Sequence, residues 1–490
     1  MSKSSDLTAL VILWAVIMTL YYAMGVNHYP MFDGDPSAFL PYAVDYAKHG
    51  TLTNPLWHSS NVFDAENPTN LTWHGFLYPI LLGWISPSAT YPGLRIVITF
   101  LWIATQSLFA LVLYRITRDT LHNQSWRALI MGAALLAGCG LLPNGGRPEL
   151  LVAFVIAASM TLLIMVEYKW HWLINGTAAG LLVATSPVCA ILFAPLVGIY
   201  TFSRSQPLTA IILQTRVLLV SCVVFTALFW FYPFTLDAWL TGMLLHSQSA
   251  IIGGSGGWVD AIRVQPSMLS IILLLLLMCG AGFITLFYKI RDAACSYCIL
   301  PLVAIIIAEA YYFWIRVPDR SYNAFAYSHL IIIGLIYSII SLTEIKSYSA
   351  PRARSIIYGF LCFSLIAASA DFIRRAIVFP FFLSDGVAYE DARGELMRLV
   401  DKGDMVSVTG GFFSLTEDYS HIEVSAHRDK FKGKWVLRQQ TYSGESKAPE
   451  INGYTLVNSN FSSTMPTYFG MKIANTCGAY NYAIYRANDL

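Results

Sequence analysis

The stretch GFLYPILLGWISP, residues 75–87, decides how this chain is threaded through a membrane. The stretch is apolar, yet it is shorter than the about 20 helical residues that cross a bilayer, and it contains Pro79. We therefore predict a helix that lies along the membrane surface. If the stretch crossed the membrane instead, every later loop would change sides.

The rest of the chain has the composition of a polytopic membrane protein. Hydrophobic residues make up 56% of the 490 residues and charged residues only 12%, whereas roughly 25% of a soluble domain is charged. Apolar runs that are candidates for spans lie near 7–29, 94–114, 127–143, 148–168, 171–186, 187–203, 209–233, 267–288, 296–315, 321–342 and 354–371. The sequence predicts a mainly α fold with about 11 transmembrane helices. Its net charge of +2 comes from scattered basic residues, which argues against nucleic-acid binding.

Lysine and arginine residues indicate the orientation, because they accumulate in cytoplasmic loops. With eleven spans and a cytoplasmic N-terminus, most of them fall in inner loops, among them Arg115, Lys169 and Arg204. A spanning helix at 75–87 would reverse this bias. We therefore expect the first long loop, 30–93, and everything after Asp371 to lie outside.

Two domains follow from this arrangement. Residues 1–372 form a transmembrane catalytic domain, and its first outer loop carries short helices near Pro36–His49 and Gly75–Trp84. Residues 373–490 form a small soluble α/β domain on the outer side. A charged helix near 390–402 begins the soluble part, and strand-like runs follow at Met405–Thr409, Trp435–Tyr442, Tyr454–Asn458 and Tyr480–Tyr485.

Two carboxylates follow the first span directly, in the run Phe32-Asp33-Gly34-Asp35-Pro36. Residues i and i+2 of an extended segment point the same way, so both acids can face one pocket. A carboxylate in that position can act as a general base. The structural alternative is that Asp35 caps the following helix and Asp33 is solvated.

Arginines on the expected outer face are candidates for binding an anion. Arg147 stands beside Glu149, and Arg316 and Arg320 flank Asp319. A guanidinium group matches phosphate oxygens bidentately. Ordinary ion pairs with the neighbouring acids are the alternative.

Histidines and a glycine run complete the candidates. His246 lies in the expected outer loop after Pro233, ahead of the glycine-rich stretch 253–257, which suits a mobile lid. His58 and His74 lie in the first outer loop beside Trp57 and Trp73. Tryptophan favours the membrane interface, so these pairs either contact substrate or anchor the surface helices.

These residues resemble motifs of the C-type glycosyltransferases, membrane enzymes that take sugars from polyprenyl-phosphate carriers. The resemblance covers about the first 370 residues in architecture. The acidic run with Ala43, Ala47 and Gly50 is similar to the acidic motif and first surface helix of the family, and His74 to Pro79 is similar to its second surface helix. Arg95 stands where the next span usually opens with arginine, and Arg147-Pro148-Glu149 resembles a recurring outer-face motif.

The resemblance implies transfer of a sugar from a polyprenyl phosphate to a glycan or lipid acceptor, on the periplasmic side of a bacterial inner membrane. The general layout is similar to that of bacterial O-antigen glucosyltransferases, which implies a lipopolysaccharide acceptor. It implies Asp35, or else Asp33, as the base of an inverting reaction. The implied donor-phosphate residues are Arg147, Arg316, Arg320 and His246, and the implied acceptor residues are Glu149, His74 and His58.

The sequence departs from the family at one point, because Gly34 separates two aspartates where adjacent Asp and Glu residues are usual. The choice of base therefore stays open. No cofactor is expected, since a monophosphate donor does not require a metal ion, although two aspartates could hold a divalent cation. The alternatives are an O-antigen polymerase or ligase, which would use lipid diphosphates, and a transporter or flippase for lipid-linked sugars.

Overall fold

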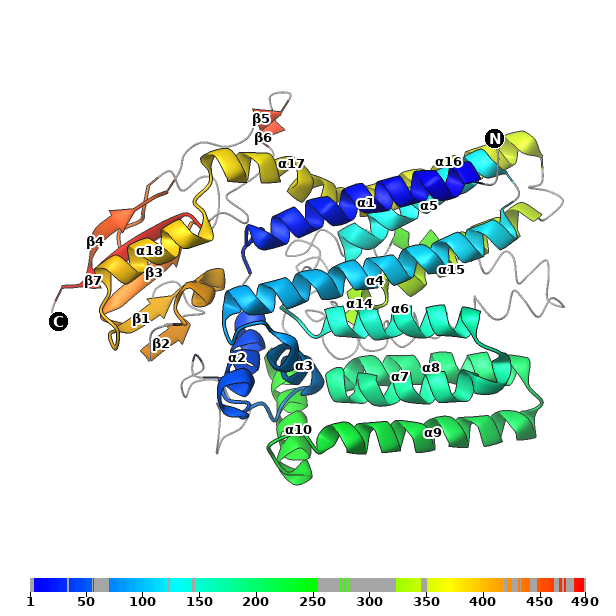
Figure 1. Cartoon of the computed structure of the whole chain (residues 1–490), viewed down its shortest axis with the longest axis horizontal. Helices are drawn as coiled ribbons and strands as arrows, with labels where there is room; N and C mark the ends of the chain where they lie inside the picture. The colour runs from blue at the N-terminus through cyan, green and yellow to red at the C-terminus, as the bar shows by residue number, and fades with distance from the viewer. Residues whose placement is uncertain are drawn as a thin grey trace.

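The computed structural model describes residues 4–32, 35–54, 56, 70–121, 123–142, 146–253, 273–274, 276–277, 280–281, 323–344, 350–417, 421–424, 431, 433–440, 447–461, 467–468, 471–472 and 480–488. Long helices run side by side in one bundle, short helices cross one end of it, and a small sheet lies beyond that end (Figure 1).

The bundle contains a helix in nine of the eleven ranges in which spans are expected. These helices are α1 (Ser4–Val26), α4 (Tyr91–Thr120), α5 (Gln124–Leu141), α6 (Glu149–Met165), α7 (His171–Thr185), α8 (Pro187–Arg204), α9 (Pro207–Phe229), α15 (Ser328–Glu344) and α16 (Pro351–Ala368). The expected spans at 267–288 and 296–315 lie mostly outside the described residues. Within the described residues, α1, α4 and α9 are long and apolar enough to cross a membrane, and a bent helix pair raises the number to four. The total of eleven spans stays a prediction.

The outer surface of α9 indicates which environment suits the bundle. Leu218 and Val223 are 63% and 68% exposed, and Trp230, which follows the helix, is 87% exposed, so α9 and its end present large apolar side chains. Soluble monomers rarely expose a continuous apolar surface of this kind. In lipid, the exposure of such an apolar surface carries no free-energy penalty.

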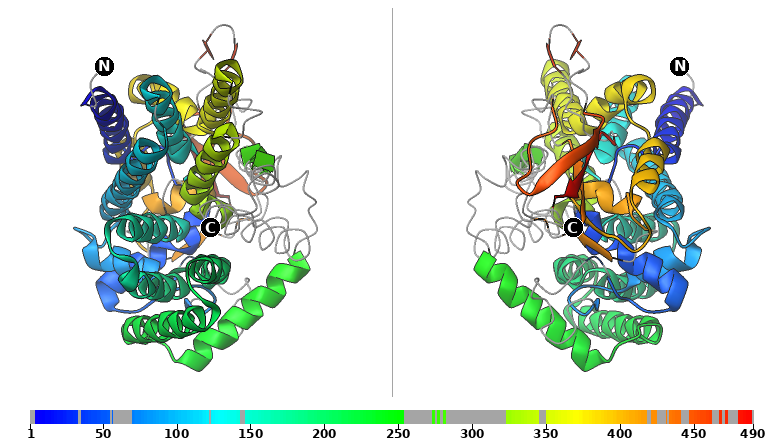
Figure 2. Two further views of the ribbon diagram at one scale, coloured as in Figure 1. Left: turned by 90° about the vertical axis from the view of Figure 1, so that its right-hand side faces the viewer. Right: turned by 90° about the vertical axis from the view of Figure 1, so that its left-hand side faces the viewer.

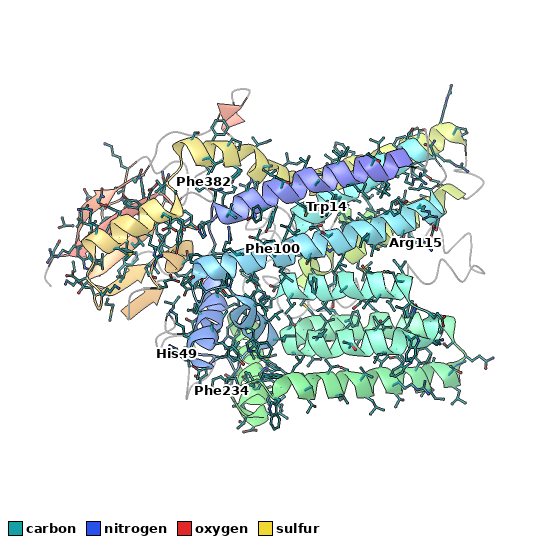
Figure 3. The ribbon with its side chains drawn as sticks, in the orientation of Figure 1. Trp14, His49, Phe100, Arg115, Phe234 and Phe382 are labelled. Atoms are coloured by element: carbon teal, nitrogen blue, oxygen red, sulfur yellow. The ribbon has the colours of Figure 1, made fainter. Side chains whose placement is uncertain are left out.

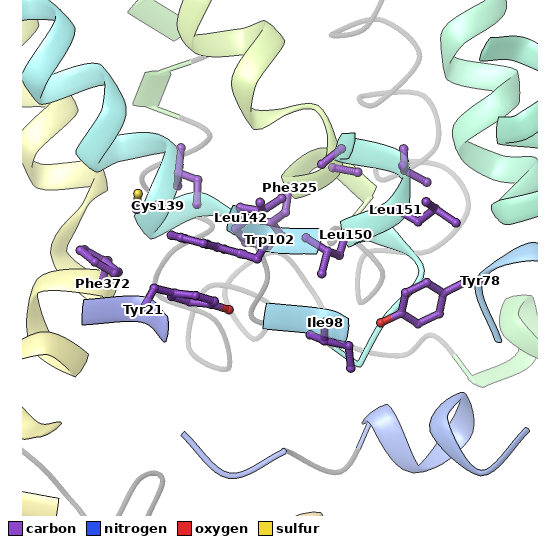
Figure 4. Packing of buried hydrophobic residues seen from close by; sticks show 14 of the residues in the cluster. Tyr21, Tyr78, Ile98, Trp102, Cys139, Leu142, Leu150, Leu151, Phe325 and Phe372 are labelled. Atoms are coloured by element: carbon purple, nitrogen blue, oxygen red, sulfur yellow. The ribbon is translucent and has the colours of Figure 1, made fainter. Parts of the chain in front are cut away.

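Aromatic stacking fixes the first helix against the bundle. The ring of Tyr21 in α1 lies 3.6 Å from that of Trp102 in α4, at an interplanar angle of 10° (Figure 4). The ring of Phe372 stacks on the same tryptophan at 6.3 Å. Gln106 of α4 donates a hydrogen bond to the Gly138 carbonyl of α5 at 3.0 Å. The C-terminal part of α1, which precedes the acidic motif, therefore packs on α4, and α4 is in turn bonded to α5.

The predicted surface helix is confirmed as a short helix. Helix α3 (Leu77–Ile85) has nine residues, and at 1.5 Å per residue it is about 14 Å long, too short for a bilayer of about 30 Å. It packs closely on α2 (Leu40–His49), because a Cβ atom at Gly83 would stand 2.8 Å from the Ala43 carbonyl oxygen. A 3-10 turn, η1 (Asp35–Ala38), leads into α2.

One expected loop is a helix. The outer segment after Pro233 forms α10 (Leu236–Gly253), which lies across the end of the bundle and not along it (Figure 1, Figure 2). His246 therefore lies on a helix. A short helix, α14 (Asn323–Ala326), precedes α15, and a turn, η2 (Tyr168–Trp170), joins α6 to α7.

The last span continues into a second helix. Helix α17 (Ala370–Asp385) follows α16 at a bend of 51°. Asp371 pairs with Arg374 at 2.8 Å and with Arg375 at 2.7 Å, so these charged side chains stabilise α17. The predicted domain boundary at residue 372 falls inside α17, so that boundary stays a prediction.

A helix and a small sheet follow, as expected from the composition. Helix α18 (Tyr389–Leu399) and η5 (Gly410–Leu415) accompany β1 (Met405–Val408), β2 (His421–Val424), β3 (Trp435–Gln439), β4 (Tyr454–Ser459) and β7 (Tyr482–Ala487), and β5 (Thr467–Tyr468) pairs with β6 (Met471–Lys472). The five-stranded sheet has the order β2-β1-β3-β7-β4. Strand β1 is parallel to both its neighbours, and β7 is antiparallel to β3 and β4. We call α18, η5, this sheet and the described residues that connect them the C-terminal domain.

Candidate functional site

The segments that contain the described candidate residues lie at one end of the bundle. The elements η1, α2, α3 and α10 gather there, next to the C-terminal domain (Figure 1). The turns between α6 and α7 and between α8 and α9, where Lys169 and Arg204 are located, lie at the opposite end with the N-terminus. Figure 3 shows the same separation, with His49 at the first end and Arg115 at the second. The turns with Lys169 and Arg204, and Arg115, thus lie at the end opposite the acidic motif, as expected for residues of inner loops.

The acidic motif packs directly against the turn that contains Arg147. Gly146 has a positive φ of 94°, and a Cβ atom there would stand 2.6 Å from Cβ and 2.7 Å from Cγ of Pro36. The backbone N–H of Gly146 also donates a hydrogen bond to the Tyr78 hydroxyl at 3.2 Å, which ties α3 to the same turn. Only glycine tolerates both this φ and this approach. Asp35 and Arg147 therefore belong to two segments in contact, although the side chain of Asp35 and the whole of Asp33 lie outside the described part.

The ion pair between Arg147 and Glu149 is present. Nε and Nη2 of Arg147 donate to the two carboxylate oxygens of Glu149 at 3.1 Å and 3.0 Å. The side chains are 14% and 4% exposed, respectively. An arginine has five N–H donors, so a bidentate pair with one carboxylate does not exclude a second anion. The pair holds the guanidinium plane in a fixed orientation near the acidic motif.

His74 lies in the same cluster. Its ring meets the ring of Phe39 edge to face at 5.1 Å, and the residue interacts electrostatically with Glu149. Its carbonyl oxygen accepts a hydrogen bond from the Trp239 indole N–H of α10 at 2.9 Å. At the next position, a Cβ atom on Gly75 would stand 2.7 Å from the Ala184 carbonyl oxygen at the end of α7. His74 is thus held between α7 and α10.

Helix α10 closes this end of the bundle over the loop that contains His74. A Cβ atom at Gly242 would stand 2.6 Å from the Thr72 carbonyl oxygen, so the helix touches the loop backbone. His246 lies one helical turn further along α10, and its side chain is not among those described.

The remaining candidates lie outside the described residues. They are His58, Arg316, Arg320 and most of the expected glycine lid. Among the residues that the structure describes, no group of three histidine, cysteine or acidic side chains is arranged to hold a metal ion. The proposed roles of the site residues stay predictions.

The structure adds a feature that the sequence did not indicate, a set of contacts between the C-terminal domain and the segment before the acidic motif. The Tyr480 hydroxyl donates to the His28 carbonyl oxygen at 3.1 Å, and the His28 ring stacks on that of Tyr389 at 4.4 Å. Burial, and then the nearby Arg95 cation, lower the pKa of His28 to about 4, so its ring is neutral at pH 7.

Comparison with known proteins extends the argument at the level of the fold. No family model matches the chain, and no curated protein is significantly similar in sequence. Among solved structures, the chain is similar to the crystal structure of ArnT from Cupriavidus metallidurans bound to undecaprenyl phosphate, with a TM-score of 0.56 and 10% sequence identity. The likeness covers 97% of this chain and 97% of that chain. The fold implied by the resemblance to C-type glycosyltransferases is therefore confirmed.

Proposed function

We propose that this chain is a glycosyltransferase that moves a sugar from a polyprenyl-phosphate carrier to a glycan or lipid acceptor. The acceptor would be an O-antigen or another part of lipopolysaccharide, reached from the periplasmic side of a bacterial inner membrane. The proposal rests on one observation above all, the packing of Pro36 on Gly146, because it joins the acidic motif to the turn that contains Arg147. The similarity over the whole length to a protein that binds undecaprenyl phosphate supports a donor of that class.

The proposed reaction inverts the configuration at the anomeric carbon. The carboxylate of Asp35 takes the proton of the acceptor hydroxyl, whose oxygen attacks the anomeric carbon of the donor. The bond between that carbon and the phosphate oxygen breaks, and the electron pair leaves with the lipid phosphate. Arg147, held by Glu149, stabilises the charge that develops on this leaving group. Asp33 orients the acceptor or the base.

The test is a transfer assay in membranes with a radiolabelled polyprenyl-phosphate sugar. Removal of a general base typically costs about 100- to 10,000-fold in rate, and we expect Asp35→Asn to lose transfer to this extent while the protein still inserts. Asp119→Asn is the matched control, because Asp119 is half-exposed at the opposite end of the bundle and pairs with Arg115. Its activity should equal that of the wild type.

Two results would contradict the proposal. Substantial transfer by Asp35→Asn would remove Asp35 from the mechanism, and the same result for Asp33→Asn would leave the acidic motif without a chemical role. Consumption of a lipid-diphosphate donor but not of the monophosphate would favour a polymerase or ligase.

A further inference from the structure

The segment between α1 and the acidic motif, residues 28–32, is held at three alternate carbonyl groups. The His28 carbonyl accepts a hydrogen bond from the Tyr480 hydroxyl at 3.1 Å. The Pro30 carbonyl accepts one from the Arg95 guanidinium of α4. The Phe32 carbonyl faces Gly411 of η5. Two of these three contacts come from the C-terminal domain.

The backbone of Gly411 lies directly against the Phe32 carbonyl group. A Cβ atom at this position would overlap the Phe32 carbonyl oxygen and would stand 2.7 Å from its carbonyl carbon. Both sides of the contact are backbone, so no side-chain rotation can relieve the overlap. Gly411 is itself buried, which leaves η5 no room to retreat. Any side chain at residue 411 would therefore displace Phe32, the residue that precedes Asp33.

The C-terminal domain also fixes the start of α4, from which Arg95 reaches the segment. The Glu417 carboxylate accepts a hydrogen bond from the backbone N–H of Tyr91 at 2.9 Å. The Phe413 ring lies edge to face with that of Tyr91 at 5.2 Å and faces the Phe32 ring at 6.3 Å. Residues 28–32 and the start of α4 both lie next to the acidic motif, and both thus contact η5.

We propose that the C-terminal domain positions the acidic motif, with Gly411 and Tyr480 as the positioning residues. This inference rests on the proposed function, in which the base lies in that motif. The domain then serves catalysis although it supplies no reacting group. The Arg95 guanidinium lies 4.5 Å from the centre of the Phe32 ring and holds the segment from the membrane side, so that residues 28–32 are fixed between two elements.

The predicted effect of Gly411→Ala follows from the geometry that proton transfer requires. A base must lie within hydrogen-bond reach of the hydroxyl that it deprotonates, and a misplacement of 1 Å can cost about 100-fold in rate. We expect Gly411→Ala to lower kcat by about 10- to 100-fold. The KM for the donor should change less than kcat, because a Cβ atom at residue 411 meets Phe32 and Met31 and not the turn that contains Arg147.

The matched control is Gly394→Ala in α18 of the same domain. A Cβ atom at Gly394 would meet nothing within 4 Å. Both variants add one methyl group to a glycine of the C-terminal domain, but only the one at residue 411 meets the backbone of Phe32. Tyr480→Phe is the second test variant, since it deletes the hydroxyl that binds His28 and leaves the buried ring in place.

The readouts are kcat per folded molecule, donor KM, Tm in detergent and the pH profile of kcat. The inference predicts that Gly411→Ala and Tyr480→Phe lower kcat and shift its pH profile, and that Gly394→Ala matches the wild type. If both test variants changed only Tm or yield, with kcat per folded molecule unchanged, the positioning role would be wrong. Asp35→Asn is assayed in parallel. An inactive Asp35→Asn with fully active Gly411→Ala and Tyr480→Phe overturns this inference alone, whereas an active Asp35→Asn overturns the proposed function.

Discussion

The Arg147–Glu149 pair shows what a single pair of residues contributes at this site. Sequence reasoning left two possibilities for Arg147, an ion pair with Glu149 or contact with a phosphate, and the structure contains the ion pair. A pair this deeply buried stabilises the fold little by itself, because the desolvation of two charges offsets their attraction. Its value here is that it fixes the guanidinium plane.

We predict that Glu149→Gln lowers both stability and donor affinity. Loss of one partner from a buried pair typically costs about 3–5 kcal/mol, because the remaining charge is uncompensated. The Tm should fall, and donor KM should rise because the guanidinium is no longer oriented. Thermal unfolding in detergent and the transfer assay measure the two effects.

Glu167→Gln is the control for this prediction. Glu167 also pairs with a cation, Lys169, but the side chains are 74% and 66% exposed. Exposed pairs are worth about 0–1 kcal/mol, so Tm and KM should stay at their wild-type values. Equal Tm values for the Glu149 and Glu167 variants would refute the role of the buried pair.

The sequence was most informative about the residue types at the site. The residue types in the acidic run and around Arg147 could be identified, because carboxylates and arginines near apolar runs are conspicuous. Their proximity could not, since it depends on Pro36 meeting Gly146, a contact between distant parts of the chain. The contact of Gly411 with Phe32 was missed for the same reason.

Among the helices and strands, periodicity and length predicted most of what is observed. The short helix α3 was expected because its apolar run is too short for a bilayer, and β1, β3, β4 and β7 were expected from their β-branched and aromatic residues. Strand β2 was missed because it is short and carries His421 and Glu423. The sequence indicated a loop in place of α10, because a glycine run follows it.

We predict that Gly242→Ala disturbs the packing of α10 on the loop that contains His74. The added Cβ atom would stand 2.6 Å from the Thr72 carbonyl oxygen, so helix or loop must move. Thermal unfolding should show a lower Tm, and transfer activity should fall as His74 is displaced.

Gly198→Ala in α8 is the comparison, because a Cβ atom there would meet nothing within 4 Å. Alanine favours a helix by about 1 kcal/mol over glycine, so this variant should match or exceed the wild-type Tm. An unchanged Tm in Gly242→Ala would mean that α10 does not press on the loop.

At the scale of the whole molecule, the orientation in the membrane is the expectation that matters most. Basic turns lie at one end of the bundle, and the acidic motif and the C-terminal domain lie at the other (Figure 1). The positive-inside rule then places the C-terminal domain outside. This placement stays a prediction.

Cysteine labelling tests it directly. Lys402 follows α18 in the exposed part of the C-terminal domain, and the Lys169 side chain is 66% exposed at the opposite end. A membrane-impermeant maleimide applied to spheroplasts should label Lys402→Cys above the wild-type background and should not label Lys169→Cys. The reverse pattern would invert the assigned sides and disprove a periplasmic site.

The continuous apolar core has a consequence for how the protein matures. Residues of α1 and α4 share one cluster with Val406, Phe412 and Ile484 of the C-terminal domain. Strand β7 hydrogen-bonds to both β3 and β4, and it leaves the ribosome after every element that it braces. A premature stop codon before β7 would thus weaken the packing of the C-terminal domain on α1 and α4, although these helices are synthesised much earlier. Nonsense mutations late in the gene should therefore be as harmful as those in its middle.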